Sequence, residues 1–198
     1  MSTSGRSAGG SSYHHGDLRA TLLATAMQML EQDEPFSLRA IARQAGVSAT
    51  APYRHFADKE ALESALAADG LRDLKIDLMA GRALPTTVAE LAEFGVAYVQ
   101  FALRRPALFR LMFGNACDDQ NDERVLAAAA VHDLIAGAVR AVFPDADPVP
   151  LATAGWGLVH GLACLHLDGK LTSTSPIDVA DQVRTAFIAT FTLRTSVG

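Results

Sequence analysis

The sequence predicts an all-α protein of about nine helices in two parts, a small N-terminal helical domain and a larger C-terminal one. Apolar residues recur every three or four positions along most of the 198 residues, which is the period of an amphipathic helix. No stretch alternates convincingly with the period of two that a half-buried strand requires. Glycine- and proline-rich breaks, GRALP at 81–85 and PDADPVP at 144–150, separate the longer helical runs.

The most informative stretch runs from Phe36 to Leu62, FSLRAIARQAGVSATAPYRHFADKEAL. Ser37 is predicted to cap a first helix, because its hydroxyl can accept from a backbone N–H of the first turn. An apolar stripe at helical spacing follows, formed by Leu38, Ile41, Ala42 and Ala45. Gly46 supplies the positive φ that a tight reversal needs, Val47 is expected to be buried at the turn, and Ser48 is expected to cap a second helix. This arrangement is a helix-turn-helix, which lays its second helix in the major groove of DNA.

The front of the second helix is suited to a close approach to DNA. Its first residues are all short: Ala49, Thr50, Ala51 and Pro52. Threonine and alanine methyl groups can contact a thymine methyl in the major groove. Tyr53, His55 and Lys59 offer donors to phosphate oxygens, which fix the register without reading sequence. Asp58 is expected to cap the next helix, whose N-terminus also favours a phosphate.

Residues from Tyr13 to about Leu66 resemble, almost position for position, the DNA-binding domain of the TetR family of bacterial transcription regulators. The core of the resemblance is GVS…YRHF…K…L, which begins at Gly46. Many members have leucine where Pro52 stands, so base preferences are not carried over from those relatives. Chemistry and resemblance together predict the DNA-binding residues Ser37, Arg39, Ser48, Ala49, Thr50, Pro52, Tyr53, His55 and Lys59.

The charge distribution separates the two parts of the chain. The formal net charge is −5, from 17 Lys and Arg against 22 Asp and Glu. The first 60 residues hold six charges of each sign, so the whole deficit lies in the remainder. We expect a flexible Ser/Gly arm at 1–12 and the DNA-binding domain at 13–66. The resemblance to the TetR family implies that 67–198 form a ligand-binding and dimerisation domain.

Compartment is predicted from the cysteines and the N-terminus. Cys117 and Cys164 are too few and too unpatterned for a disulfide framework, and the N-terminus lacks an apolar signal core. A cytoplasmic location is therefore expected.

Capping and breaking residues set the expected helix boundaries. Thr87 and Glu90 have the spacing of a capping box. Residues 114–119 are expected to form a loop, and Asn121 or Asp122 to open the helix after it. The last break is expected to end before Leu151. The N-terminal domain is expected to begin with one helix, followed by the two helices of the helix-turn-helix. The remaining predicted helices cover about 59–79, 87–104, 106–113, 121–143, 151–167 and 175–193.

The C-terminal part carries a second resemblance. GWGLVHG, with Trp156, His160 and Gly161, resembles the Trp-His-Gly (WHG) class of C-terminal domains in TetR-like regulators. The segment RRPALFRLMFG from Arg104 to Gly114 fits the same class, and the resemblance covers roughly Thr87 to Phe191. It implies an all-helical body that dimerises and holds a small-molecule pocket.

Aromatic residues at helical spacing mark the candidate pocket. Phe94, Tyr98 and Phe101 share one helix face and can meet side chains of two later helices. Aromatic residues in such a pattern are most often simply core. Tyr98, Trp156 and His160 are the better ligand candidates, because each carries a polar group that needs a partner when buried. The predicted pocket for a small hydrophobic or aromatic effector comprises Phe94, Tyr98, Phe101, Met112, Phe113, Trp156 and His160.

The last two predicted helices carry the expected dimer interface. One stripe consists of Leu158, Leu162 and Leu165, and the other of Val183, Phe187 and Phe191. Two such helices from each subunit would make a four-helix contact. A homodimer also matches a palindromic operator through its two-fold symmetry.

Metal, enzyme and membrane interpretations are not favoured by the sequence. His160 and Cys164 share a helix face, but His166 is turned away, and zinc requires four convergent ligands. No Ser/His/Asp order, nucleophile elbow or glycine-rich phosphate loop is present, so no catalysis, metal or cofactor is predicted. Residues 148–167 carry no formal charge and are long enough to span a membrane, but two prolines and two histidines favour a buried core helix.

The predicted function is therefore transcription regulation through sequence-specific binding of double-stranded DNA. By family resemblance we expect a homodimeric repressor that a ligand releases from its operator. The alternative is a helical ligand-binding protein without a DNA-binding role. Such a protein has no reason to keep Ser48, Tyr53, His55 and Lys59 together.

Overall fold

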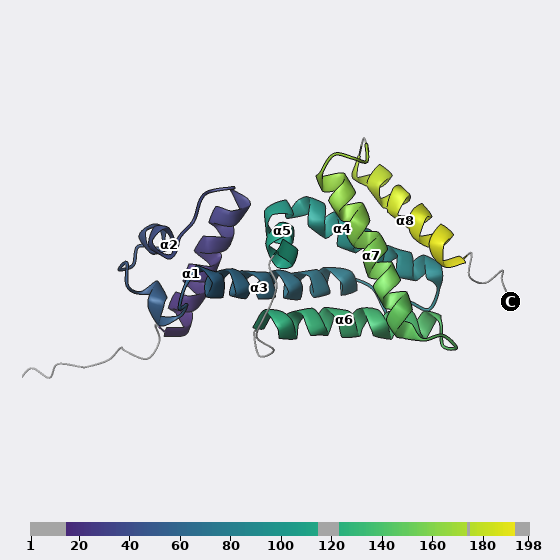
Figure 1. Ribbon diagram of the computed structural model, residues 1–198, viewed down its shortest axis with the longest axis horizontal. Coiled ribbons are helices and arrows are strands. Elements are labelled where there is room, and N and C mark those ends of the chain that lie inside the picture. The colour runs from purple at the N-terminus through teal and green to yellow at the C-terminus, as the bar shows by residue number, and fades with distance from the viewer. Residues whose placement is uncertain (1–14, 115–122, 174, 193–198) are drawn as a thin grey trace, which may run out of the picture. The chain divides into compact units, whose positions relative to one another are not determined.

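The structure is a computed structural model that describes residues 15–114, 123–173 and 175–192 (Figure 1). The predictions made for the arm at 1–12, for Tyr13, for Cys117 and for the helix start at 121 or 122 lie outside the described residues. So does most of the loop expected after Gly114.

All regular secondary structure among the described residues is helical, with eight α-helices, one 3₁₀ helix and no strand. This confirms the all-α prediction. The elements are α1 (His15–Glu31), α2 (Leu38–Gln44), the 3₁₀ helix η1 (Pro52–Arg54), α3 (Lys59–Met79), α4 (Val88–Arg104), α5 (Pro106–Gly114), α6 (Glu123–Val142), α7 (Pro148–Leu167) and α8 (Pro176–Thr192).

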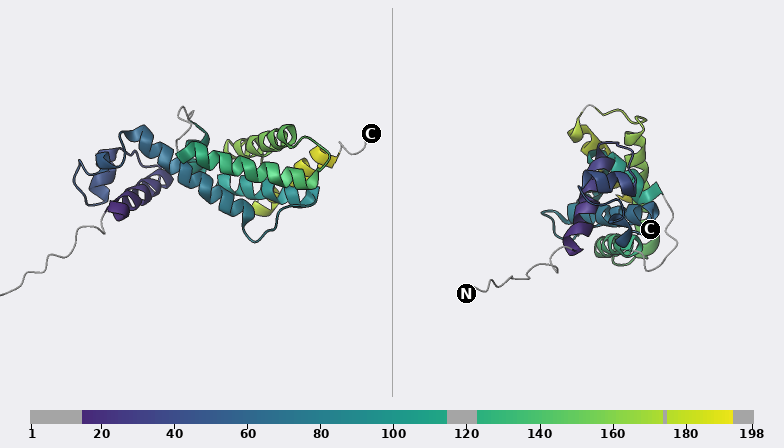
Figure 2. Two further views of the ribbon diagram at one scale, coloured as in Figure 1. Left: turned by 90° about the horizontal axis from the view of Figure 1, so that it is seen from below. Right: turned by 90° about the vertical axis from the view of Figure 1, so that its left-hand side faces the viewer.

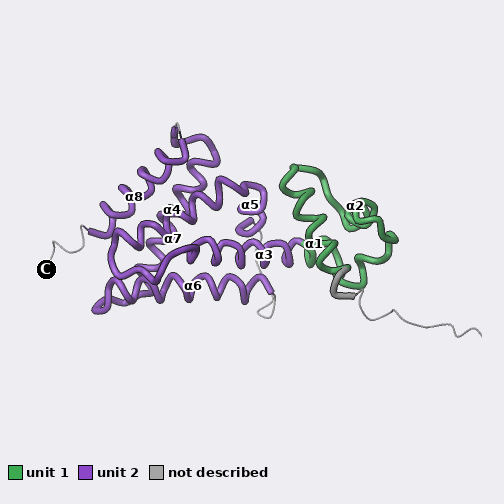
Figure 3. The backbone as a smooth tube through the Cα atoms, turned by 180° about the vertical axis from the view of Figure 1, so that it is seen from behind, with its two compact units in different colours: residues 1–62 green, residues 63–198 purple. Residues whose placement is uncertain are grey.

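The chain forms two compact units, residues 1–62 and 63–198 (Figure 3). Helix α3 begins in the first unit and contributes most of its length to the second. The first unit is built on α1, which packs against α2. Its core includes Leu22 and Ala26 of α1, Ile41 of α2 and Phe56, all of which are almost fully buried.

Helix α4 is the centre of the second unit and packs against α5, α6, α7 and α8. It begins with the predicted capping box, in which Thr87 Oγ1 accepts from the Glu90 N–H at 3.2 Å. Its apolar residues are buried on nearly every side, as expected of a helix that is hydrophobic all round. Gly95 permits the close approach of α7, because an added Cβ would lie 2.9 Å from Val159 Cγ1.

The outer helices of the second unit cover α4 from different directions. Helix α7 crosses α4 in Figure 1, with α8 beside it. Helix α6 lies along another face of this unit, as the view from below shows (Figure 2).

The start of α7 was predicted too late. The helix begins at Pro148 rather than Leu151, because Asp147 caps it by accepting from the Val149 N–H at 3.0 Å. Proline is well tolerated in the first turn, where its missing N–H would have no intrahelical partner. The PDADPVP segment thus ends one helix and starts the next.

Two helices are long and apolar enough to cross a membrane, judged by length and composition alone. They are α6 and α7, and 22% and 17% of the residues in their apolar windows are buried. Two such helices are weak evidence for a membrane span, since core helices of other proteins pass the same test.

Candidate nucleic-acid interface and effector cavity

The turn after α2 has the predicted geometry. Gly46 adopts φ 70°, and the N–H of Val47 donates to the Ala42 carbonyl at 2.9 Å. The Gly46 N–H donates to the Arg43 carbonyl at 3.2 Å, which completes a glycine-terminated helix end. At the other end of α2, Ser37 Oγ accepts from the Ala40 N–H at 3.2 Å, so the predicted N-cap is confirmed. Val47 is half-buried rather than buried.

The second helix of the motif is shorter than predicted. Only Pro52–Arg54 forms a helix, and it is a 3₁₀ helix with Ala51 rather than Ser48 at its N-cap. The Ala51 N–H donates to the Ser48 carbonyl, three residues back, while Pro52 has no N–H to donate. The Ser48 hydroxyl lies 3.3 Å from that of Thr50 and does not cap the helix. Proline and these three-residue bonds together explain the tight conformation.

Most of the predicted DNA-binding side chains are exposed. Ser37, Arg39, Ser48, Ala49, Thr50, Tyr53 and Lys59 all reach solvent. Tyr53 is notable because a large aromatic ring is 49% exposed without packing into the core. These side chains are therefore placed where a ligand as large as DNA can reach them.

Two predicted residues of the motif are placed differently. Pro52 is buried, which leaves little of its ring for a base contact. His55 is half-buried, and its Nε2 is buried without a hydrogen-bond partner in the described part of the chain. The Nε2 atom is therefore turned away from the surface that Tyr53 presents to solvent.

The start of α3 completes this surface. Asp58 caps the helix as predicted, its Oδ1 accepting from the Ala61 N–H at 2.8 Å. Lys59 is exposed in the first turn, and its Nζ lies 5.3 Å from the centre of the Phe36 ring. Such a cation–π contact holds the ammonium group near the surface of the unit.

A hydrogen-bonded trio stands at the centre of the predicted pocket in the second unit. The Tyr98 hydroxyl lies 2.9 Å from His160 Nδ1 and accepts from Trp156 Nε1 at 3.2 Å. Phe109 and Phe113 pack around it, with the Phe113 ring centre 4.9 Å from that of His160. Burial raises the pKa of the Tyr98 phenol and lowers the pKa of His160. Both groups are therefore held in their neutral forms at neutral pH.

The cavity beside this trio, called the main cavity below, has a volume of about 200 Å³. A second hollow of about 270 Å³ is lined by residues of α6 and α7. Helices α3, α4, α5, α6 and α7 all contribute to its wall. The lining residues are Leu71, Leu74, Tyr98, Met112, Phe113, Arg124, Ala128, Val131, His132, Ile135 and Trp156. Four predicted pocket residues are among them: Tyr98, Met112, Phe113 and Trp156.

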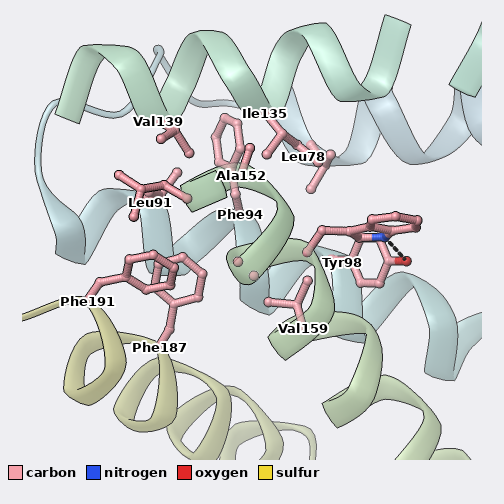
Figure 4. A pocket seen from close by; sticks show the side chains of 14 residues that line it. Leu78, Leu91, Phe94, Tyr98, Ile135, Val139, Ala152, Val159, Phe187 and Phe191 are labelled. Carbon is pink, nitrogen blue, oxygen red and sulfur yellow. Dashed lines mark hydrogen bonds between the residues drawn. The ribbon is translucent and has the colours of Figure 1, made fainter. Parts of the chain in front are cut away.

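A smaller cavity of about 40 Å³ lies deeper in the core (Figure 4). Phe94 lines it, together with Phe187 and Phe191, whose side chains point inward from α8. It has room for little more than water-sized molecules. Neither Phe101 nor His160 lines any of these cavities. Phe101 is 1% exposed, so its assignment to the pocket is corrected to the core. His160 is half-buried and is linked to the cavity wall through its contact with the Tyr98 hydroxyl.

Half of the predicted dimer interface is also core. Val183, Phe187 and Phe191 are 0%, 4% and 2% exposed, so they have no surface to offer a second subunit. Phe187 and Phe191 stack on one another, with ring centres 4.6 Å apart. The inward face of α8 was mistaken for its outward face, because both a core and an interface produce the same apolar stripe. The predicted residues of α7 are more accessible: Leu158 and Leu162 are half-buried and Leu165 is 42% exposed.

Sequence reasoning missed the contribution of α6 to the main cavity. Arg124, Ala128, Val131 and Ile135 recur at helical spacing and line one side of it. The sequence contains this pattern as an otherwise apolar stripe that begins with a charged residue, Arg124. A stripe of this kind is easily taken for a core face that begins one turn later.

The structure combines a helix-turn-helix that exposes hydrogen-bond donors with a helical body that contains a cavity, and helix α3 runs from one to the other. This is the architecture of a DNA-binding transcription regulator. The family comparisons specify the class further. Residues 22–66 match the family described as bacterial regulatory proteins, tetR family, and residues 91–191 match the tetracyclin repressor-like C-terminal domain. The chain belongs to the TetR family of transcription regulators. Neither description names the Trp-His-Gly class, so that narrower assignment stays a prediction.

Solved structures share the fold. A protein of unknown function from Rhodococcus sp. RHA1 is 34% identical, with 90% of this chain and 97% of that chain covered at a TM-score of 0.75. A TetR/AcrR-family regulator from Thermobifida fusca shares the fold at 17% identity, with 88% and 98% covered and a TM-score of 0.61. A TetR regulator from Rhodococcus sp. RHA1 does so at 21% identity, with 87% and 94% covered and a TM-score of 0.58. A comparison with curated proteins finds no match.

Proposed function

We propose that this regulator is a cytoplasmic repressor that binds a palindromic operator as a homodimer and is released by a small effector. The observation that carries the DNA-binding part is the exposed tip after Gly46. Ser48, Thr50 and Tyr53 reach solvent there without contributing to the core. These exposed side chains are therefore accessible to a ligand that approaches the surface of the protein.

The contacts to DNA divide by chemistry. Ala49 and Thr50 contact base edges, where their methyl groups meet thymine methyls. Ser37, Arg39, Ser48, Tyr53 and Lys59 hold phosphates and fix the register. Pro52, being buried, shapes the tight turn rather than reading a base. His55 supports the same turn, since its Nε2 is directed inward.

The dimer forms through the accessible face of α7. Leu165 is 42% exposed on this face, and a Cβ added at Gly161 would meet nothing within 4 Å. A second helix could therefore approach closely at Gly161. The low buried share of the apolar window of α7, 17%, also supports a partner that covers it. The outward face of α8, which includes the 72% exposed Ile177, replaces the buried stripe predicted first.

Effector binding acts through α3. Leu71 and Leu74 of this helix line the main cavity, and the same helix begins at Lys59 beside the DNA-binding tip. Gly70 of α3 packs against Met112, another lining residue, so closely that an added Cβ would lie 2.7 Å from its Sδ. A ligand that prefers one position of α3 shifts the population away from the DNA-bound state.

The test is selection of binding sites from a random DNA pool with the purified protein, followed by the salt dependence of the best site. We expect a palindromic consensus whose affinity falls steeply with salt. In the same selection, Thr50→Ala should change the preferred bases at one position of each half-site. No enrichment at low salt by a folded protein would support the alternative, a ligand-binding protein without a DNA-binding role.

A further inference from the structure

The hollow between α6 and α7, called the outer hollow below, adjoins the main cavity. Its volume is about 270 Å³, against about 200 Å³ for the main cavity. His132 and Ile135 of α6 and Trp156 of α7 line both spaces, so these three side chains stand between them. The two spaces are therefore divided at least in part by side chains, which can change rotamer.

Trp156 is the largest of these three side chains, and few interactions hold it in place. It is half-buried, and its Nε1 donates to the Tyr98 hydroxyl at 3.2 Å, the long end of the usual range. Its indole meets the exposed His132 ring edge-on, with ring centres 5.2 Å apart. Trp156 also lines the small deep cavity, so it borders three spaces in which packing partners are missing. Moving this indole costs less than moving a fully packed ring.

The walls of the two spaces differ in polarity. The main cavity is mostly aliphatic and aromatic, and Leu71 and Leu74 of α3 lie in its wall. The outer hollow has exposed polar residues in its wall, namely His132, Asp133 and Thr153. A molecule that fills both spaces would therefore have an apolar body inside and a hydrogen-bonding group at its outer end.

The volumes set the length of such a molecule. An apolar cavity of about 150 Å³ is enough to bind benzene. The main cavity alone, at about 200 Å³, thus holds one ring or a short chain. The outer hollow more than doubles this space once the indole moves aside.

We propose that the main cavity and the outer hollow form one binding site for an elongated aliphatic molecule with a hydrogen-bonding group at one end, and that Trp156 is the movable partition between them. The ligand enters through the outer hollow and displaces the indole. Its chain then reaches Leu71 and Leu74, and its polar end stays beside Thr153. That this ligand releases DNA rests on the function proposed above, whereas its binding does not.

The first test compares hexan-1-ol with decan-1-ol, whose chains differ by four methylene groups. Titration calorimetry on the full-length protein without DNA measures each affinity. Each methylene that becomes buried strengthens binding about fourfold. Because the longer chain extends through both spaces, decan-1-ol should bind more tightly by a factor above about 10 and up to about 200. A smaller ratio, or no binding of either alcohol, would overturn the proposal.

Three alanines of α6 allow one substitution to be placed in each space and outside both. Of the described cavities, Ala136 lines only the outer hollow, Ala128 lines only the main cavity, and the exposed Ala129 lines none. Ala136→Phe should reduce the preference for decan-1-ol to below about tenfold, while hexan-1-ol binds as before. Ala128→Phe should weaken both alcohols, and the control Ala129→Phe should change neither.

These variants also define the results that contradict the site. An unchanged preference for decan-1-ol in folded Ala136→Phe would remove the outer hollow from the site. Unchanged binding in Ala128→Phe would place both alcohols elsewhere. If Ala136→Phe does not fold, Thr153→Phe gives the same test from α7, because Thr153 is exposed and lines only the outer hollow among the described cavities.

The fluorescence of Trp156 tests the partition itself. Trp156 is the only tryptophan of the chain, so a change in tryptophan emission on mixing with decan-1-ol reports on this side chain. Tyr98→Phe removes the acceptor of the indole N–H, and the association rate measured by stopped flow should rise about two- to tenfold. Unchanged affinity for hexan-1-ol would show that the cavity is intact in this variant. An equal association rate would overturn the role of Trp156.

Failure of this inference can be told apart from failure of the proposed function. If decan-1-ol binds as predicted but does not release the selected operator, the binding site stands and effector release by this class of molecule fails. If an operator is selected but neither alcohol binds, the regulator stands and this inference fails.

Discussion

The two units place their functional residues in opposite environments. In the DNA-binding unit, Thr50 and Tyr53 are exposed, while Ile41 and Phe56 form the core beneath them. In the body, Tyr98 lines the main cavity and is 2% exposed, so a residue of the proposed binding site is also part of the packed core. Stability and function can therefore be separated by mutation in the first unit but not readily in the second.

The largest effect is expected from Phe101→Ala in the body. Phe101 is 1% exposed on α4 but lines no described cavity, so its loss leaves a void in the core without touching a ligand. The free energy of unfolding should fall by about 3–5 kcal/mol. Urea denaturation measures it. A loss below about 1 kcal/mol, the range of surface substitutions, would contradict the assignment to the core.

The second-largest effect is expected at the proposed dimer interface. Gly161→Arg introduces a charged side chain where an added Cβ would meet no described residue within 4 Å, so the subunit should fold but fail to pair. Affinity for an operator with two half-sites should then fall about a hundredfold or more, because the DNA-binding units of two subunits would no longer bind together. Sedimentation velocity measures the oligomeric state.

The matched control for the dimer variant is Gly137→Arg. Gly137 lies in α6, is also half-buried, and likewise has nothing within 4 Å of an added Cβ. It should leave the dimer intact. Dissociation by both variants, or by neither, would remove α7 as the interface.

Tyr53→Phe should separate function from stability in the DNA-binding unit. The change deletes a donor on a 49% exposed side chain, so the unfolding midpoint should not move. Operator affinity should weaken by about 1.5–3 kcal/mol, the range for a hydrogen bond to a charged group. Because phosphates carry no sequence information, the loss should be similar on operator and random DNA. Fluorescence anisotropy on both duplexes measures it, and a loss confined to the operator would make Tyr53 a base-reading residue.

The smallest effect is a pH dependence of the body. Burial lowers the pKa of both His160 and His166, so the unfolded chain binds more protons than the folded one below the ordinary histidine value of about 6.5. Stability should therefore be lost as the pH falls through this range. Thermal melts from pH 7.5 downward should show a shallower loss for the His160→Gln, His166→Gln double variant. An unchanged slope would assign the acid sensitivity to other groups.

The sequence predicted what local rules determine. The caps at Ser37, Thr87 and Asp58 and the positive φ of Gly46 each depend on a few neighbouring residues, and all were predicted correctly. The 3₁₀ conformation at Pro52 was missed because the missing N–H acts together with the packing of the proline ring.

The body shows where such rules stop. An apolar stripe indicates that a helix face is buried, but not whether the same chain or a second subunit buries it. The stripe through Val183 and Phe187 therefore predicted an interface and proved to be core. Arg124 was missed for a related reason, because only the approach of α3, α5 and α7 turns a charged helix start into a cavity wall.

The central claim is that α3 couples the DNA-binding tip to the cavity, and hydrogen–deuterium exchange tests it without knowledge of the effector. Coupling between two sites is reciprocal, so operator binding must also alter the cavity. With the selected operator, and not with a scrambled duplex of equal length, amide exchange should change along α3 as far as Leu71 and Leu74. Changes confined to residues 37–59 would contradict the account, because the tip would then bind DNA without affecting the cavity wall.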